Sequence, residues 1–184
     1  RVQVEHTVTE EVTGIDIVRA QIMIAEGKSI VEATGCASQY DVELDGHALQ
    51  CRVTTEDPHN NFIPDYGRIQ MYRSATGPGI RLDGGTAYSG AVITRFYDSL
   101  LTKVTARAQT PEMAIARMDR ALREFRIRGV ATNIDFVINL LKPPTFLSNE
   151  YSTKFIDDTP SLFDFSSRRD RATKILTYIA DITV

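Results

Sequence analysis

Polar and apolar residues alternate along the first six positions of the chain. Because neighbouring side chains of a strand point to opposite faces, Arg1, Gln3 and Glu5 share one face of an extended segment. The other face carries two valines and a histidine, which are Val2, Val4 and His6. The alternation predicts a strand that the valines anchor in a core and that presents a guanidinium, an amide and a carboxylate in one row.

Two helices are predicted next. Residues 7–10 fit a capping box and start a short helix that ends at Gly14. Asp16 fits the cap of a second helix, which ends at Gly27. One stripe of that helix is apolar and consists of Ile17, Val18, Ile22 and Ala25. Residues 28–46 lack a periodic pattern and are predicted to be irregular chain and turns.

The middle of the chain has the pattern of β structure. Residues 47–53 predict a strand with an apolar and a polar face. The first face carries His47, Leu49, Cys51 and Val53, and the second carries Ala48, Gln50 and Arg52. Short β-like runs alternate with turn signals from residue 62 onward, and residues 100–106 form the last of them. The connections are too short for helical crossovers, so an antiparallel sheet is expected.

The last third of the chain is predicted to be mainly helical. Thr110-Pro111 marks a helix start. The apolar stripe of this helix consists of Ile115, Met118, Leu122 and Phe125. Thr132-Asn133 fits the cap of another helix through Leu141. A short helix interrupted at Pro160 is predicted over residues 152–163, and a last helix over residues 170–182. The sequence therefore predicts an α+β fold in which helices frame an antiparallel sheet.

The composition excludes several classes of function. A net charge of −3 and a pI near 5.6 give no electrostatic footprint for nucleic acid, and no apolar run approaches the length of a membrane span. Cys36 and Cys51 are too few for a disulfide scaffold, so we expect structural thiols in a reduced intracellular compartment. The three histidines follow no metal-ligand spacing, and the glycines at 77–79 and 84–85 are typical of hairpin turns, not of a phosphate loop.

The row of Arg1, Gln3 and Glu5 contains groups that bind and deprotonate a small oxyanion. A guanidinium and an amide hold such an anion, and a carboxylate beside them is placed to accept its proton. The alternative is a half-exposed strand with one ion pair across its face. Alternation alone favours that simpler interpretation.

The first fourteen residues, RVQVEHTVTEEVTG, resemble the active-site strand of biotin-dependent carboxylases. The segments Gln50–Pro58, Phe96–Leu100 and Gly129–Asn133 also resemble elements of the biotin carboxylase module. The resemblance runs the length of the chain and implies that residues 1–165 have the fold of the C-terminal part of that module. The upstream part, which carries the ATP-grasp nucleotide site in the family, is absent from the sequence.

The family resemblance also bears on subtype and on domain organisation. Arg81–Gly85, Phe155–Pro160 and Asp170–Leu176 resemble pyruvate carboxylases more than acyl-CoA carboxylases, which implies carboxylation of pyruvate to oxaloacetate. The equivalent part of an acyl-CoA carboxylase is the alternative, and the sequence after Val184 would separate the two. Residues 166–184 are expected to form a helix that leads toward the next domain. The chain lacks an initiator methionine and begins inside a predicted strand, so a piece of a longer polypeptide is expected.

The resemblance implies a role for each candidate site residue. Glu5 would be the general base that takes the proton of bicarbonate, and Arg1 would hold the bicarbonate oxygens through its planar fork. Gln3 and the backbone N–H of Val4 would complete the bicarbonate pocket. ATP would convert bicarbonate to carboxyphosphate, which releases CO2 and phosphate. Arg52 would then stabilise the enolate-like biotin.

The same resemblance implies cofactors and partners. Biotin on a carrier domain outside this segment, ATP and Mg²⁺ would be needed, with the Mg²⁺ ligands upstream of Arg1 and no metal ligand in the sequence itself. Without the ATP-grasp half, the segment alone is expected to be inactive. Family members are oligomers, so a homotetramer is expected. The predicted location is the cytoplasm, with the mitochondrial matrix as the alternative.

A hypothesis from a different class is a non-catalytic oligomerisation or effector-responsive module. Its basis is a cluster of cations near the start of the last predicted helix, namely Arg168, Arg169, Arg171 and Lys174. In that hypothesis Arg171 would contact a phosphorylated effector, such as the acetyl-CoA that activates many family members. A solvated helix face explains the cluster more simply.

Overall fold

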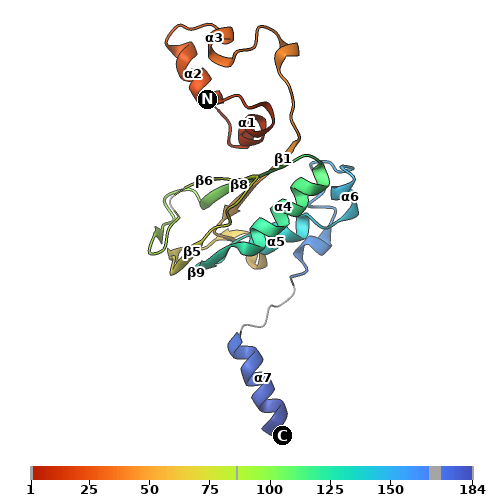
Figure 1. Ribbon diagram of the computed structural model, residues 1–184. Coiled ribbons are helices and arrows are strands. Elements are labelled where there is room, and N and C mark those ends of the chain that lie inside the picture. The colour runs from red at the N-terminus through yellow and green to blue at the C-terminus, as the bar shows by residue number, and fades with distance from the viewer. Residues whose placement is uncertain (1, 86, 166–170, 184) are drawn as a thin grey trace.

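The computed structural model describes residues 2–85, 87–165 and 171–183. Its central sheet is antiparallel, as predicted, and framed by helices (Figure 1). The strands of that sheet follow the order β1 (His47–Thr54), β8 (Leu100–Ala108), β6 (Ile80–Gly84). The predicted strands at residues 47–53 and 100–106 are thereby confirmed.

Shorter antiparallel ribbons extend the β structure around this sheet. The pairs are β2 (Glu56–Asp57) with β3 (Ile63–Pro64), β4 (Gly67–Arg68) with β7 (Val92–Ile93), and β5 (Met71–Arg73) with β9 (Arg126–Arg128). A 3-10 turn, η3 (Pro58–Asn60), separates β2 from β3. The prediction of short β runs between residues 62 and 105 is confirmed, whereas β9, which follows a helix, was not predicted.

Helix α4 (Pro111–Glu124) covers one face of the sheet (Figure 1). It begins where the sequence predicted, because the Thr110 hydroxyl accepts a hydrogen bond from the Met113 N–H at 3.3 Å and Pro111 occupies the first turn. Buried residues of α4 and the sheet form the main core, and they include Met118, Ala121, Leu122, Val53, Val104 and Ala106. Full burial of one large apolar side chain stabilises the fold by about 1.5–3 kcal/mol, so this layer dominates its stability.

The chain after α4 follows the predictions only in part. Helix α5 (Ile134–Leu140) is confirmed, and a short helix α6 (Pro144–Leu147) follows it. The predicted helix over residues 152–163 is wrong before Pro160, where turns replace it, whereas the predicted interruption at Pro160 coincides with the start of the 3-10 helix η4 (Pro160–Phe163). Proline cannot donate a helical hydrogen bond, and the aromatic rings of this region pack on one another instead.

The final helix, α7 (Arg171–Thr183), agrees with the prediction over residues 170–182. No helix within the described ranges combines the length and apolarity that a membrane crossing requires.

Within the described residues, three α-helices precede the sheet and lie on the side of it away from α4 in Figure 1: α1 (Thr7–Thr13), α2 (Ile17–Ala25) and α3 (Ile30–Thr34). Gly14 ends α1 in a left-handed conformation, and the Asp16 carboxylate caps α2 by accepting the Arg19 N–H at 2.8 Å, both as predicted. The predicted apolar stripe of α2 is not buried, since Val18 and Ile22 are 50% and 56% exposed. No described element covers that face of the helix.

Residues 28–46 are more regular than predicted. Helix α3 begins with a capping box, in which Ser29 accepts the Glu32 N–H and Glu32 accepts the Ser29 N–H. The signal, a serine followed three residues later by a glutamate, was present in the sequence. A 3-10 turn, η2 (Gln39–Asp41), follows α3.

Candidate functional site

The first described residues do not form the predicted strand. Val4–His6 is a 3-10 turn (η1) that leads into α1, and Val2 and Gln3 have no regular structure. A strand needs a neighbour to satisfy its backbone hydrogen bonds, and none of the described strands pairs with this segment. The alternation nevertheless persists in the exposure, because Gln3 and Glu5 are exposed and the residues beside them are half-buried. Arg1 lies outside the described residues.

Strand β1 meets this segment through Gln50. The Gln50 side-chain amide donates hydrogen bonds to the carbonyl oxygen of Val4 at 2.5 Å and to the hydroxyl of Thr7 at 3.0 Å. The Val4 carbonyl belongs to the same planar peptide group as the N–H of Glu5. The bond therefore fixes the backbone that carries the Glu5 side chain, and it joins two segments that lie 46 residues apart in sequence.

Arg52 lies two positions after Gln50 on β1, on the same face of the strand. Residues so spaced lie about 7 Å apart along a strand, so Arg52 is the next residue on the face of β1 that meets η1 through Gln50. Its guanidinium is exposed and makes no hydrogen bond or ion pair with the described residues. An anion held near Glu5 can therefore meet a free cation from β1.

Asn133 holds the backbone around Arg52. The Asn133 side-chain N–H donates to the Arg52 carbonyl at 2.9 Å, and its side-chain oxygen accepts from the Thr54 N–H at 3.0 Å. These bonds span the register shift at Val53 and Thr54, and Asn133 is only 8% exposed. Asn133 occupies the predicted N-cap position of α5, but its side chain makes no cap bond there and bonds to β1 instead.

Glu56 connects the end of β1, at Thr54, to Ser99, the residue directly before β8. Its two carboxylate oxygens accept hydrogen bonds from the hydroxyl of Ser99 at 3.0 Å and from the hydroxyl of Thr54 at 3.2 Å. The side chains of Glu56, Ser99 and Asn133 thus brace the region of Arg52.

The sequence alone predicted no role for Glu56 or Ser99. For Asn133 it predicted a helix cap and not the contact with β1. The available signal was their place inside the segments that carry the family resemblance, namely Gln50–Pro58, Phe96–Leu100 and Gly129–Asn133. The hydrogen bonds show that these segments meet at one place in the fold.

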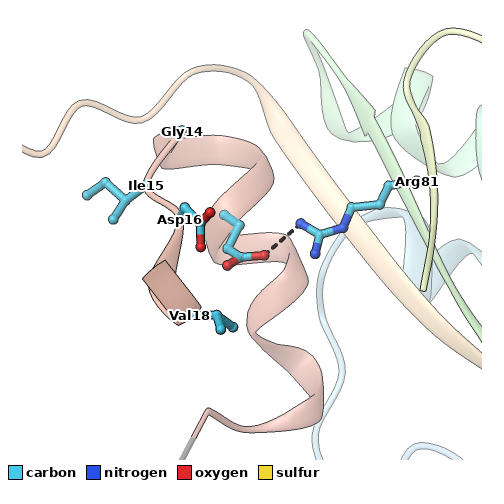
Figure 2. A pocket seen from close by; sticks show the side chains of 6 residues that line it. Gly14, Ile15, Asp16, Val18 and Arg81 are labelled. Atoms are coloured by element: carbon cyan, nitrogen blue, oxygen red, sulfur yellow. Dashed lines mark ion pairs between the residues drawn. The ribbon is translucent and has the colours of Figure 1, made fainter. Parts of the chain in front are cut away.

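A shallow hollow of about 420 Å³ lies beside the turn between α1 and α2 (Figure 2). It is lined by Glu10, Gly14, Ile15, Asp16, Val18 and Arg81. Arg81 reaches it from β6 and forms an ion pair with Glu10 at 2.7 Å. None of the described candidate residues lines this hollow. The guanidinium of Arg81, which does line it, is already neutralised by Glu10 and Asp83. We therefore do not place the functional site there.

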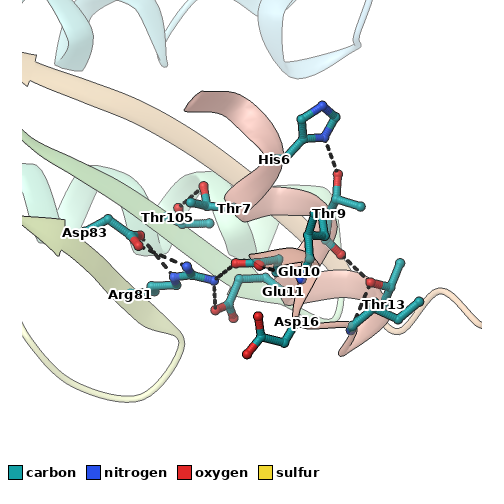
Figure 3. Close-up of polar contacts among 12 residues, drawn as sticks. His6, Thr7, Thr9, Glu10, Glu11, Thr13, Asp16, Arg81, Asp83 and Thr105 are labelled. Carbon is teal, nitrogen blue, oxygen red and sulfur yellow. Dashed lines mark hydrogen bonds and ion pairs between the residues drawn. The ribbon is translucent and has the colours of Figure 1, made fainter. Parts of the chain in front are cut away.

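Arg81 instead fastens α1 to the sheet, as Figure 3 shows. Its guanidinium donates to both carboxylate oxygens of Asp83 at 2.9 and 3.0 Å, and Glu11 lies 3.8 Å away. The hydrogen bonds to Asp83, and to a smaller extent the bond to Glu10, raise the pKa of Arg81. The other oxygen of Glu10 accepts from the Ile17 N–H at 2.9 Å. The predicted capping box of α1 is therefore wrong, since the carboxylate of Glu10 ties α1 to α2 and β6.

A pair of buried hydroxyls fixes the first turn of α1 to β8. The Thr7 and Thr105 hydroxyl oxygens are 2.8 Å apart, and the two residues are 6% and 1% exposed (Figure 3). The sheet register pairs Thr105 with Gln50 on one side and with Arg81 on the other. Helix α1 thus lies across one row of the sheet, on the face opposite α4, and this row sets the position of Glu5.

The two cysteines lie outside this arrangement. Cys51 points toward α4 with its sulfur 3.5 Å from that of Met118, and burial raises the pKa of its thiol to about 12. Cys36 is half-buried near the end of α3, and both thiols are free. This agrees with the prediction of structural thiols.

The predicted Mg²⁺ ligands and the predicted effector contact both concern groups outside the described residues. Within the described ranges, no three His, Cys, Asp or Glu side chains lie close enough to hold a metal ion, and the upstream Mg²⁺ ligands stay a prediction. Arg168, Arg169 and the side chains of Arg171 and Lys174 lie outside the described residues. The effector role of Arg171 therefore stays a prediction as well.

Comparisons with known proteins identify related sequences. Residues 50–158 match the biotin carboxylase C-terminal domain family, and residues 1–33 match the family of the carbamoyl-phosphate synthase L chain, ATP binding domain. Pyruvate carboxylase from Bacillus subtilis (strain 168) is 54% identical over 185 residues, which cover 100% of this chain and 16% of that protein. The chain thus spans about one sixth of the length of the curated relatives it matches.

Solved structures give the same result. The complete multifunctional pyruvate carboxylase from Rhizobium etli is 66% identical with a TM-score of 0.91, and the match covers 100% of this chain and 17% of that one. The biotin carboxylase domain dimer of Hydrogenobacter thermophilus 2-oxoglutarate carboxylase is 38% identical with a TM-score of 0.84, covering 91% of this chain and 36% of that one. That structure contains MgADP, ADP and bicarbonate.

Proposed function

The chain belongs to the biotin carboxylase C-terminal domain family, and we propose that within a longer protein it forms part of the site that carboxylates biotin with bicarbonate and ATP. The observation that carries this proposal is the hydrogen bond from Gln50 to the carbonyl of Val4. It sets the backbone of a carboxylate, Glu5, beside the strand of a free cation, Arg52. Deprotonation of one reactant and stabilisation of charge on another require such a pair.

Glu5 acts on bicarbonate, which is a poor nucleophile until it loses its proton. The exposed Glu5 carboxylate takes that proton, while the Gln3 amide and the Val4 N–H orient the bicarbonate oxygens. Arg1 adds a bidentate contact through its guanidinium. The deprotonated oxygen then attacks the terminal phosphorus of ATP, which yields carboxyphosphate and ADP. Carboxyphosphate breaks down to CO2 and phosphate.

Arg52 acts in the carboxyl transfer. Biotin, held on a carrier domain outside this chain, would supply the ureido nitrogen that takes up the carboxyl group, and the phosphate released from carboxyphosphate would accept the proton of that nitrogen. The exposed guanidinium of Arg52, without a partner among the described residues, would then stabilise the negative charge on the ureido oxygen. Asn133 fixes the backbone of Arg52, and with it the point of β1 from which the guanidinium extends.

ATP and Mg²⁺ are held elsewhere in this proposal. The glycines of the described residues do not open a helix as a phosphate loop does, while residues 1–33 match a part of an ATP-binding domain family. The exposed apolar side chains of α2 and α3 fit a contact with further parts of such a domain; they are Val18, Ile22, Ile24, Ile30 and Val31. The segment alone is accordingly expected to lack activity.

Pyruvate is the acceptor we propose for the full-length protein, with oxaloacetate as the product. Support comes from the identities of 54% and 66% to two pyruvate carboxylases, each over 100% of this chain. The same proposal includes a homotetramer, a biotin carrier domain, an acetyl-CoA-type effector at Arg171, and a location in the cytoplasm or, as the alternative, in the mitochondrial matrix.

An assay of the parent polypeptide tests the proposal. It should form oxaloacetate from pyruvate, bicarbonate and MgATP. Bicarbonate-dependent ATP cleavage stimulated by free biotin, without oxaloacetate, would keep the carboxylation chemistry and point to an acyl-CoA acceptor. Absence of both reactions would refute the proposed function.

A further inference from the structure

Lys103 lies directly opposite Arg52 in the sheet. The register of β1 and β8 pairs Arg52 with Lys103, and the register of β8 and β6 pairs Lys103 with Asp83. Residues paired across an antiparallel sheet share a face, so Lys103 is on the same face as Arg52. The neighbouring row on that face is Gln50, Thr105 and Arg81, over which η1 and α1 lie.

No described acid neutralises this pair of cations. Asp83 is the nearest acid in the row, but both of its oxygens bind Arg81 (Figure 3). Neither Arg52 nor Lys103 makes a side-chain hydrogen bond or ion pair with another residue in the described ranges. Like charges directly opposite each other on neighbouring strands destabilise a sheet. An anion that binds between them removes this repulsion.

We propose that Lys103 is the second cation of the Arg52 site and that the two together bind a small oxyanion. This inference deepens the proposed function and rests on it. Cα atoms of directly opposite residues are about 4.5–5.5 Å apart, which lets two long side chains converge on one ligand. Arginine offers a planar fork and lysine a mobile point charge, and both are common phosphate binders.

The chemistry favours an oxyanion with more than one negative charge. Bicarbonate carries a single charge, which one arginine can balance, whereas phosphate carries between one and two charges near pH 7. Two cations in one row therefore match the phosphate group released from carboxyphosphate better than they match bicarbonate. Lys103 would hold that phosphate next to Arg52 while the carboxyl group is transferred.

The test uses inorganic phosphate as the probe and the full-length protein. Bicarbonate-dependent ATP cleavage with free biotin is measured at increasing phosphate for wild type, Lys103→Gln and Lys103→Arg. Exposed Lys142, which bonds only to Asn139, provides the matched control Lys142→Gln. We expect the inhibition constant for phosphate to rise about 10- to 100-fold in Lys103→Gln, as for loss of one charge-assisted bond. It should recover in Lys103→Arg and stay unchanged in Lys142→Gln.

Two outcomes would overturn the inference. One is equal phosphate inhibition in Lys103→Gln and wild type. The other is a joint loss of phosphate inhibition, MgATP affinity and thermal stability that Lys103→Arg does not restore, since it would make Lys103 a structural residue. If wild type shows no bicarbonate-dependent cleavage, the proposed function fails, and calorimetry of phosphate binding to the same variants still decides whether Lys103 binds the anion.

Discussion

The side-chain amide of Gln50 donates a hydrogen bond of 2.5 Å to the carbonyl oxygen of Val4. Through the planarity of the peptide group, this contact positions the N–H and Cα of Glu5 as well. The same amide also binds the Thr7 hydroxyl, which is itself bonded to Thr105 in the sheet. Gln50 thus couples the start of the chain to the central sheet and acts as a positioning residue for Glu5.

Replacing Gln50 should weaken catalysis more than folding. Gln50→Ala in the full-length protein is expected to lower kcat for bicarbonate-dependent ATP cleavage about 10-fold, the cost of one hydrogen bond of typical strength, with the KM for MgATP unchanged. Gln50→Glu should behave similarly, because a carboxylate cannot donate to the Val4 carbonyl. Exposed Gln109 provides the control Gln109→Ala. A parallel fall in kcat and thermal stability, with MgATP affinity lost, would contradict a positioning role.

Asn133 is expected to contribute to both stability and activity. Asn133→Ala leaves the Arg52 carbonyl and the Thr54 N–H without their partner, at a cost of about 1–3 kcal/mol. Asn133→Asp retains an acceptor for Thr54 but loses the donor to Arg52, so a smaller loss is expected. Chemical denaturation measures both, with exposed Asn60→Ala as the control. Equal stability of Asn133→Ala and Asn60→Ala would show that these bonds add nothing.

The Glu10 carboxylate is expected to contribute through two separable contacts. Glu10→Gln keeps an acceptor for the Ile17 N–H but loses the charge that pairs with Arg81, which should cost about 0.2–1 kcal/mol and less at high salt. Glu10→Ala should lose about 1 kcal/mol more, because the Ile17 bond also disappears. Glu124→Gln, at an exposed pair on α4, is the control with little expected effect. Thermal unfolding at low and high salt gives the comparison, and salt-independent losses would argue against the ion pair.

Cys51 should resist alkylation in the folded protein. Both cysteines are half-buried, but desolvation raises the pKa of the Cys51 thiol to about 12, so Cys36 should react first. Unfolded Cys51 ionises near 9.0, so the unfolded chain loses this proton at lower pH than the folded one. Its contribution to stability is therefore present below pH 9 and falls as pH rises toward 12. Peptide mapping after iodoacetamide treatment checks the order, and faster labelling of Cys51 would contradict its burial.

The sequence predicts some elements well because their signals are local. Thr110-Pro111 defines the start of α4, and the alternation from His47 to Val53 defines β1. The alternation at the start of the chain was equally regular, yet it does not produce a strand. Its conformation depends on Gln50 and Thr105, which contact the segment from 46 and 98 residues away.

The candidate site, like the fold, could be predicted from the sequence only in part. Family resemblance predicts Glu5 and Arg52 as site residues, and the Gln50 side chain joins β1 to the segment that precedes Glu5. Asn133 looked like a helix cap, because asparagine before an apolar run is a common cap signal. Only the packing of α5 against β1 reveals that its amide bonds across the strand. Lys103 gave no sequence signal, since its meaning depends on the register of three strands.

We propose that Glu5 acts on bicarbonate and Arg52 on biotin, while ATP binds elsewhere in the full-length protein. The most direct measurement is bicarbonate-dependent ATP cleavage with free biotin, together with MgATP affinity, in full-length Glu5→Gln and Arg52→Ala. We expect each substitution to lower the rate about 10²- to 10³-fold, as loss of a preorganised charged group does, with MgATP affinity nearly unchanged. Collapse of MgATP binding, or activity close to wild type, would contradict the assigned roles.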